Sequence, residues 1–201
     1  MNPDPTRIKP NRSARFTVAL GIALLSLLVL LALSLRQPRL STSAQGRPGD
    51  PLAVRSSSFS DGGAIPQRYT CDGAGISPNL QWSTAPGGTK SFALVMNDPD
   101  APIDFTHWLA YNIPSSAHEL AEGASTGGAM PDGSSEGTNS FGRTEYGGPC
   151  PPAGRPHRYV FHLFALDSRL DLPAEVERSR LESAMKTHIL GSGEIVGRYG
   201  R

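Results

Sequence analysis

The chain has 201 residues, enough for one domain and an appendage, and its 38% content of hydrophobic residues excludes a wholly disordered protein. Its 22 glycines and 18 prolines predict many turns and argue against an all-helical bundle. The net charge is +1, but residues 1–35 hold four of the 19 basic and one of the 18 acidic residues, so the remainder carries −2. A nucleic-acid-binding protein normally has a dense basic surface, and this chain therefore does not fit that class.

The first predicted element is a transmembrane helix. Residues 16–35 are twenty uncharged, mainly aliphatic residues, long enough as a helix to cross the roughly 30 Å hydrocarbon layer of a membrane. Because four basic residues precede this helix, we expect residues 1–15 to stay in the cytoplasm and the rest of the chain to lie outside. A cleaved signal peptide, which would release a secreted protein, is the alternative.

Residues 36–52 are rich in proline, glycine and serine and lack periodicity, which predicts a flexible linker. Residues 53–201 then form one domain. Its short apolar runs, separated by turn residues, predict strands at 91–97, 106–113, 158–166 and 194–199. The alternation within the second of these runs is expected to place four side chains on one face: His107, Leu109, Tyr111 and Ile113.

One α-helix is predicted near the C-terminus. Ser179 with Glu182 fits a capping box at its start, and Gly191 fits the position that follows its end. The apolar face would comprise Leu181, Ala184, Met185, His188 and Ile189. The fold expected from these elements is mainly β, with a C-terminal helix packed on a sheet.

Three polar clusters lie at the ends of the predicted strands, at 97–102, 105–108 and 147–159. If those strands are neighbours, two carboxylates, two imidazoles and a phenol converge: Asp98, Asp100, His107, His157 and Tyr159. Such a group suits a small anion with protonatable oxygens, and the carboxylates are expected to raise the pKa of both histidines and hold them charged. The plainer interpretation of Asp98–Asp100 is a turn.

These clusters together resemble the phosphatidylethanolamine-binding protein family, in its bacterial Raf kinase inhibitor-like branch. The similar motifs are TCDG at 70–73, SPNLQW at 77–82, DPDAP at 98–102, THWLAYNIP at 106–114 and GGPCPPAGRPHRYVFHLFALD at 147–167. The resemblance implies a β-sandwich with an antiparallel central sheet. It also implies a surface pocket for phosphate-like anions and phospholipid head groups, formed by Asp98, Asp100, His107, His157 and Tyr159 and walled by the turn at Gly148 and Pro149.

The expected function is therefore ligand binding without catalysis. One alternative is an inhibitor of a kinase or protease partner, which the long loop 123–137 could contact; a homodimer also stays open. Another is a serine hydrolase, since residues 133–137 satisfy G-x-S-x-G, but that motif requires a strand–turn–helix and here follows a loop. No cofactor is expected. The spacing of histidines and aspartates matches no metal-binding signature, so no metal is expected either.

Cys71 and Cys150 are the only cysteines. A domain exported across the membrane meets an oxidising compartment, where cysteines pair. We therefore expect a disulfide that closes a 79-residue loop and ties the TCDG segment to the pocket wall. Two free thiols are the alternative, because sequence alone does not place two Cα atoms within bonding range.

Overall fold

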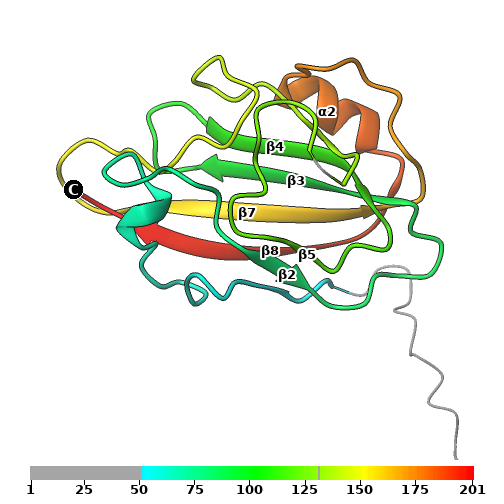
Figure 1. Cartoon of the computed structure of the whole chain (residues 1–201), viewed down its shortest axis with the longest axis horizontal. Helices are drawn as coiled ribbons and strands as arrows, with labels where there is room; N and C mark the ends of the chain where they lie inside the picture. The colour runs from blue at the N-terminus through cyan, green and yellow to red at the C-terminus, as the bar shows by residue number, and fades with distance from the viewer. Residues whose placement is uncertain (1–50, 131) are drawn as a thin grey trace, which may run out of the picture. The chain divides into compact units, whose positions relative to one another are not determined.

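Two antiparallel β-sheets face each other in the computed structural model, which describes residues 51–130 and 132–201 (Figure 1). The larger sheet has the strand order β6-β4-β3-β7-β8, formed by β6 (Ser135–Glu136), β4 (Phe105–Pro114), β3 (Ser91–Asp98), β7 (His157–Leu166) and β8 (Ile189–Tyr199). The smaller sheet has the order β1-β2-β5, formed by β1 (Val54–Arg55), β2 (Leu80–Trp82) and β5 (Glu119–Leu120). A 3₁₀ turn, η1 (Gln67–Tyr69), and one helix, α2 (Arg178–Met185), complete the elements of the described residues. The predicted β-sandwich with a C-terminal helix is confirmed.

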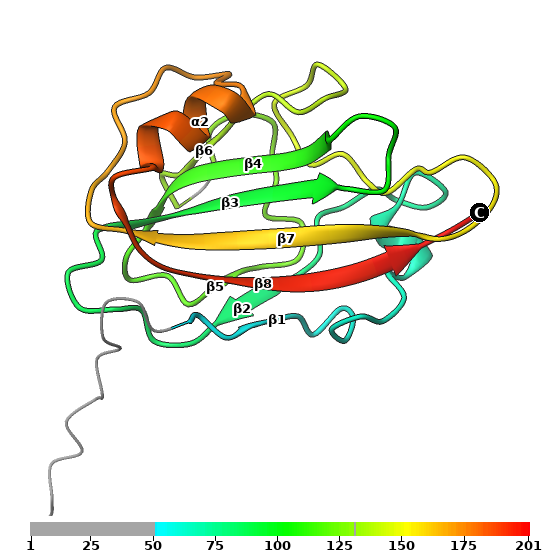
Figure 2. The same ribbon diagram turned by 180° about the vertical axis from the view of Figure 1, so that it is seen from behind.

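Strand β3 is the centre of the fold because its residues are apolar on both faces. Every residue of β3 is buried, and the strand pairs with β4 on one side and β7 on the other. Phe92, Leu94 and Met96 pack toward the smaller sheet, whereas Ala93 and Val95 face α2. The described domain therefore has three layers, with the smaller sheet and the helix on opposite faces of the larger sheet (Figure 2).

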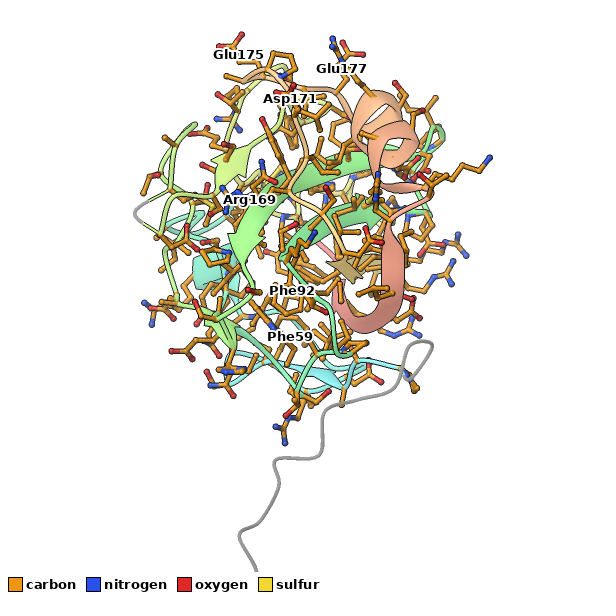
Figure 3. The ribbon with its side chains drawn as sticks, turned by 90° about the vertical axis from the view of Figure 1, so that its right-hand side faces the viewer. Phe59, Phe92, Arg169, Asp171, Glu175 and Glu177 are labelled. Carbon is orange, nitrogen blue, oxygen red and sulfur yellow. A yellow bond between two sulfur atoms is a disulfide. The ribbon has the colours of Figure 1, made fainter. Side chains whose placement is uncertain are left out.

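Each face of the larger sheet has its own apolar cluster. Phe59 and Phe92 lie inside the layer between the sheets, and the loop that carries Asp171, Glu175 and Glu177 leads over the other face into α2 (Figure 3). The apolar cluster on that face packs against Ala93 and Val95. It includes Leu166 of β7, Leu170 and Val176 of the loop, and Leu181 and Met185 of α2. Burying apolar surface on both faces stabilises a sheet that would otherwise expose one of them.

The predicted single face of residues 106–113 is wrong. Leu109 and Tyr111 pack toward α2, whereas Ile113 belongs to the cluster between the sheets. Two β-bulges in β4 explain this, one at His107 and one that includes Asn112, whose φ is 58°. Each bulge adds one residue and so reverses the alternation of faces.

The predicted limits of the helix and the last strand also need correction. Glu177, not Ser179, is the N-cap of α2, and Glu182 pairs with Arg178 (Nε–Oε1 2.6 Å). The helix ends at Met185, so Ile189 and Gly191 lie in β8, which begins five residues before the predicted strand at 194. Pairing along the whole of β7 satisfies the backbone of this glycine-rich segment.

Glycine is required in β8 where another segment crosses it. The backbone N–H of Leu52 donates to Ser192 O (2.9 Å), and a Cβ placed on Gly193 would lie 1.8 Å from Leu52 O. The first described residues thereby pack directly on β8.

The predicted transmembrane helix at 16–35, the segment 1–15 and nearly all of the linker at 36–52 lie outside the described residues. None of the described helices has the length and apolar character that a membrane span requires.

Candidate functional site

Four of the predicted site residues line one cavity of about 240 Å³, which we call the aromatic cavity. The four are Asp98 at the end of β3, His107 in β4, and His157 and Tyr159 at the start of β7. They meet because β3 pairs antiparallel with both β4 and β7, so its C-terminal end lies beside their N-terminal ends. The lining also includes Ala101, Pro102, Phe105, Phe141, Cys150, Pro151 and Pro152.

The bulge at His107 aims this imidazole into the cavity. Thr106 pairs with Asn97 and Trp108 pairs with Met96, which leaves His107 as the additional residue. Its ring lies nearly perpendicular to the Tyr159 ring, with centroids 5.1 Å apart. Bulges commonly redirect one side chain in this way.

Asp98 and His157 form a buried pair. The carboxylate Oδ2 of Asp98 lies 2.7 Å from Nδ1 of His157, and Oδ1 accepts hydrogen bonds from the backbone N–H groups of Asp100 (2.9 Å) and Ala101 (3.1 Å). The carboxylate thus orients the imidazole and holds the loop after β3. Because Nδ1–H donates to the carboxylate, Nε2 is the nitrogen of His157 left for a ligand.

His107 is held in a similar orientation by a neutral acceptor. Its Nδ1 lies 2.7 Å from Gly147 O, and a carbonyl oxygen only accepts, so Nδ1 carries the proton. Burial lowers the pKa of His107, against smaller opposing influences from Gly147 and Asp98. The expectation that the carboxylates raise the pKa of both histidines is therefore wrong for His107, because desolvation outweighs the neighbouring charge.

Tyr159 presents an unpartnered hydroxyl. The side chain is completely buried, and its oxygen has no hydrogen-bond partner of good geometry among the described residues. Burial raises the pKa of Tyr159 well above its ordinary value, and the charge of Asp98 raises it further, against a smaller opposing effect of the Cys150 N–H. The hydroxyl stays protonated, and a buried donor without an acceptor is costly unless a ligand supplies one.

Asp100, Gly148 and Pro149 do not line the aromatic cavity. Asp100 accepts two hydrogen bonds from the Arg158 side chain and one from its backbone N–H, each 2.9 Å long, and these interactions hold its pKa well below the ordinary range. Gly148 packs against Tyr69 and Thr70, and Pro149 O accepts a hydrogen bond from Cys71 N (3.1 Å). These three residues therefore lie outside the lining of the aromatic cavity.

The disulfide between Cys71 and Cys150 is confirmed, with Cα atoms 5.4 Å apart. Cys150 lines the aromatic cavity, and both cysteines are exposed. The bond joins the loop after η1 to the segment that continues into Pro151 and Pro152. It thus fastens one wall of the cavity to the body of the domain.

The G-x-S-x-G match has no hydrolase geometry. Ser135 lies in the short strand β6, which pairs with Ala110 and Tyr111 of β4, and no helix follows it. The described hydrogen bonds of this segment join Ser135 to no histidine.

Sequence analysis missed two features near the site. Phe141 packs on Phe105 and His107 (ring centroids 4.8 and 5.5 Å), yet it lies in an irregular segment with no periodic signal. Glu136 is a buried carboxylate that accepts from Trp108 Nε1 (2.7 Å), Ser125 Oγ (2.5 Å) and the N–H groups of residues 126–128. These bonds fasten the first part of the loop 123–137 to the sheet.

Comparisons with known proteins agree with this architecture. Residues 55–200 match the sequence model of the family described as "Phosphatidylethanolamine-binding protein". A UPF0098 protein of Methanothermobacter thermautotrophicus is 46% identical over 151 residues, which is 75% of this chain and 99% of the relative. Another, from Aquifex aeolicus, is 48% identical over 158 residues, which is 76% of this chain and 91% of the relative.

Solved structures give the same result. A phosphatidylethanolamine-binding protein homolog from Chlamydia trachomatis superimposes with a TM-score of 0.69 at 36% identity, covering 76% of this chain and 99% of the homolog. YbcL of E. coli, described as a member of the mammalian PEBP family, has the same TM-score at 31% identity and the same coverage.

Proposed function

The chain belongs to the phosphatidylethanolamine-binding protein family, and on that premise we propose that it binds a phosphate-like anion or a phospholipid head group in the aromatic cavity. The observation that carries the proposal is the buried Tyr159 hydroxyl, a donor with no partner of good geometry among the described residues. An anionic oxygen in the cavity would accept this hydrogen bond. A charge-assisted bond of this kind is stronger than one between neutral groups.

The two imidazoles add a second element of recognition. Nδ1 of each ring is engaged by the protein, so Nε2 of His107 and of His157 is available to the ligand. A neutral Nε2 accepts a hydrogen bond, which suits an oxygen that still carries a proton, as in hydrogen phosphate. The cavity therefore combines a fixed donor, the Tyr159 hydroxyl, with two imidazole nitrogens that are oriented by the protein.

We further propose that the domain lies outside the cytoplasm, anchored by residues 16–35 and tethered by residues 36–52. The uncharged stretch and the basic residues before it support this topology. The disulfide adds independent support, since such bonds form and persist mainly in oxidising compartments.

Binding without turnover is part of the proposal. The lining of the aromatic cavity contains no serine or threonine, and its one cysteine is engaged in the disulfide. The cavity therefore lacks the hydroxyl or thiol nucleophile that serine and cysteine hydrolases activate with a histidine. Phosphoesters and carboxylic esters should therefore be recovered unchanged after incubation with the protein.

Isothermal titration calorimetry with inorganic phosphate tests the anion site. Tyr159→Phe, which removes only the hydroxyl, should weaken binding by about tenfold or more, as expected for one hydrogen bond to a charged group. Tyr111→Phe is the matched control, because its hydroxyl donates to Pro173 O (2.9 Å) on the other face of the sheet. Equal affinities for Tyr159→Phe and the native protein would overturn the proposal.

A further inference from the structure

A second and larger cavity, of about 500 Å³, adjoins the aromatic cavity. Phe141 and Cys150 line both, so the two cavities adjoin at these residues. Sites for small organic ligands usually measure about 300–1,000 Å³. The aromatic cavity, at about 240 Å³, is smaller than that range, whereas its neighbour falls within it. The aromatic cavity therefore has room for a head group but not for a complete organic ligand.

The larger cavity, which we call the glycine-lined cavity, is lined in part by backbone that no side chain covers. Four glycines contribute to its lining: Gly73, Gly75, Gly123 and Gly148. A Cβ on Gly148 would lie 2.9 Å from Tyr69 O, and one on Gly73 would lie 2.2 Å from Gln67 O. Close packing thus requires glycine at these two positions, and without a Cβ the backbone itself forms part of the cavity surface. The N–H groups of Gly73 and Gly123 are already engaged, since they donate to Thr70 O (3.1 Å) and Ser77 O (2.8 Å). Such a surface recognises groups that form hydrogen bonds.

One buried hydroxyl of this cavity has no acceptor for its hydrogen among the described residues. Ser77 is 1% exposed and lines the cavity, and its Oγ accepts a hydrogen bond from Ser125 N (3.2 Å). Its own O–H donates to no acceptor among the described residues. Ser125 is itself fixed, because its Oγ donates to the buried carboxylate of Glu136 (2.5 Å). The Ser77 hydroxyl is therefore a positioned donor rather than a mobile surface group.

The charges of the glycine-lined cavity cancel. Arg143 and Glu145 form an ion pair (2.9 Å) with exposed side chains, and the guanidinium of Arg143 also lies over the Phe141 ring, 5.4 Å from its centroid. The lining carries no other charged side chain. A neutral polar group suits this environment better than a second anion or an alkyl chain.

We infer that the two cavities together hold one ligand, a phosphate ester of a hydroxylated alcohol such as glycerol or a sugar. The phosphate occupies the aromatic cavity, and the alcohol portion passes Phe141 and bonds to Ser77 and the backbone of residues 73–77. This inference rests on the proposed anion site and adds the class of ligand. A lipid head group and a free metabolite share this chemistry.

Calorimetry with three probes tests the inference: inorganic phosphate, glycerol 3-phosphate and propyl phosphate. Two additional hydrogen bonds predict that glycerol 3-phosphate binds about tenfold more tightly than either of the others. Equal affinities for glycerol 3-phosphate and propyl phosphate would overturn the inference while leaving the anion site intact. No binding of inorganic phosphate at all would contradict the proposed function, and the inference with it.

A variant that fills the glycine-lined cavity gives a second test. Ala74 is exposed and lines this cavity but not the aromatic one, so Ala74→Trp should reduce the ratio of the two affinities, glycerol 3-phosphate over inorganic phosphate, to about one. Ala174→Trp, at an exposed position on the loop before α2, is the matched control and should keep the ratio near ten. A ratio that Ala74→Trp leaves unchanged would overturn the inference.

Calorimetry with a short-chain, water-soluble phosphatidylglycerol identifies the source of the ligand, with short-chain phosphatidylcholine as the control. Tighter binding of the phosphatidylglycerol that Ala74→Trp abolishes supports the inference with a lipid as the ligand. Tight binding of free glycerol 3-phosphate, without a preference for this lipid, supports it with a soluble ester. If the protein binds neither the free ester tightly nor the phosphatidylglycerol preferentially, the inference is overturned.

Discussion

The imidazole of His157 lies 2.7 Å from the carboxylate of Asp98, and both side chains are almost completely buried. This contact joins the end of β3 to the start of β7 and leaves only Nε2 of His157 for a ligand. The same carboxylate holds the following loop through the N–H groups of Asp100 and Ala101. Asp98 thus links β3, β7 and the loop after β3 at the aromatic cavity.

Asp98→Asn should weaken phosphate binding by about tenfold to a hundredfold. The amide keeps the size of the side chain but loses the charge of the acceptor that orients His157, and hydrogen bonds to charged groups contribute about 1.5–3 kcal/mol. Calorimetry at pH 6.5 measures the effect. Asp100→Asn is the control, because that carboxylate bonds Arg158 outside the cavity and its loss should change affinity much less. Equal losses in the two variants would contradict this assignment.

The pH dependence of stability should report the burial of His107. Burial lowers the pKa of His107 in the folded chain, so below the reference value of about 6.5 the unfolded chain binds more protons than the folded one. Stability is therefore retained above pH 6.5 and lost as the pH falls below it. Urea unfolding between pH 5 and 7.5 should show a smaller loss for His107→Gln.

His162 contributes to the same slope. Burial also lowers the pKa of His162, against an opposing effect of Glu194. The double variant His107→Gln with His162→Gln should therefore depend least on pH over this range. A slope equal to that of the native protein would show that neither histidine is responsible.

The disulfide should stabilise the domain and preserve the cavity wall. Closing a 79-residue loop stabilises the folded chain by on the order of 4 kcal/mol in the chain-entropy view. Reduction should lower the urea midpoint accordingly and weaken phosphate binding, because Cys150 lines the aromatic cavity. The double variant Cys71→Ser with Cys150→Ser should behave like reduced protein and not respond to reductant. Two titratable thiols in denatured, unreduced protein would contradict the bond.

Glu136→Gln should destabilise the fold by roughly 2–4 kcal/mol. The carboxylate accepts five hydrogen bonds, and an amide nitrogen in place of one oxygen would face donors instead of acceptors. Thermal unfolding gives the difference. Glu145→Gln, an exposed glutamate on the nearby loop, should change stability by less than about 1 kcal/mol. A stability loss no larger than that of Glu145→Gln would contradict the buried network.

The sequence correctly predicts those elements whose local hydrophobic pattern matches their burial in the fold. β3 and β7 are continuous apolar runs, and both became central strands. The helix was found through Leu181 and Met185, but its end was misplaced because pairing of Ile189 with Leu166 extends β8. Pattern alone did not indicate the bulges of β4, since a bulge is a property of the pairing between strands.

The candidate site divides in the same way. Asp98, His157 and Tyr159 were identified because they occupy the ends of strong strands. The sequence identifies His107, but it predicts the wrong orientation for the side chains of this strand, because the alternating pattern does not indicate the bulge. Asp100 bonds Arg158 instead of facing the cavity, and no sequence pattern separates these two uses of a carboxylate. Phe141 was missed because it arrives from an irregular loop whose path is set by contacts distant in sequence.

A crystal structure of the protein soaked in phosphate tests the central claim most directly. The account predicts one phosphate in the aromatic cavity, with an oxygen within hydrogen-bond distance of the Tyr159 hydroxyl and others near Nε2 of His107 and His157. The same soak of Tyr159→Phe should show lower occupancy there. An aromatic cavity that holds no phosphate, at a concentration that saturates binding in calorimetry, would contradict the account.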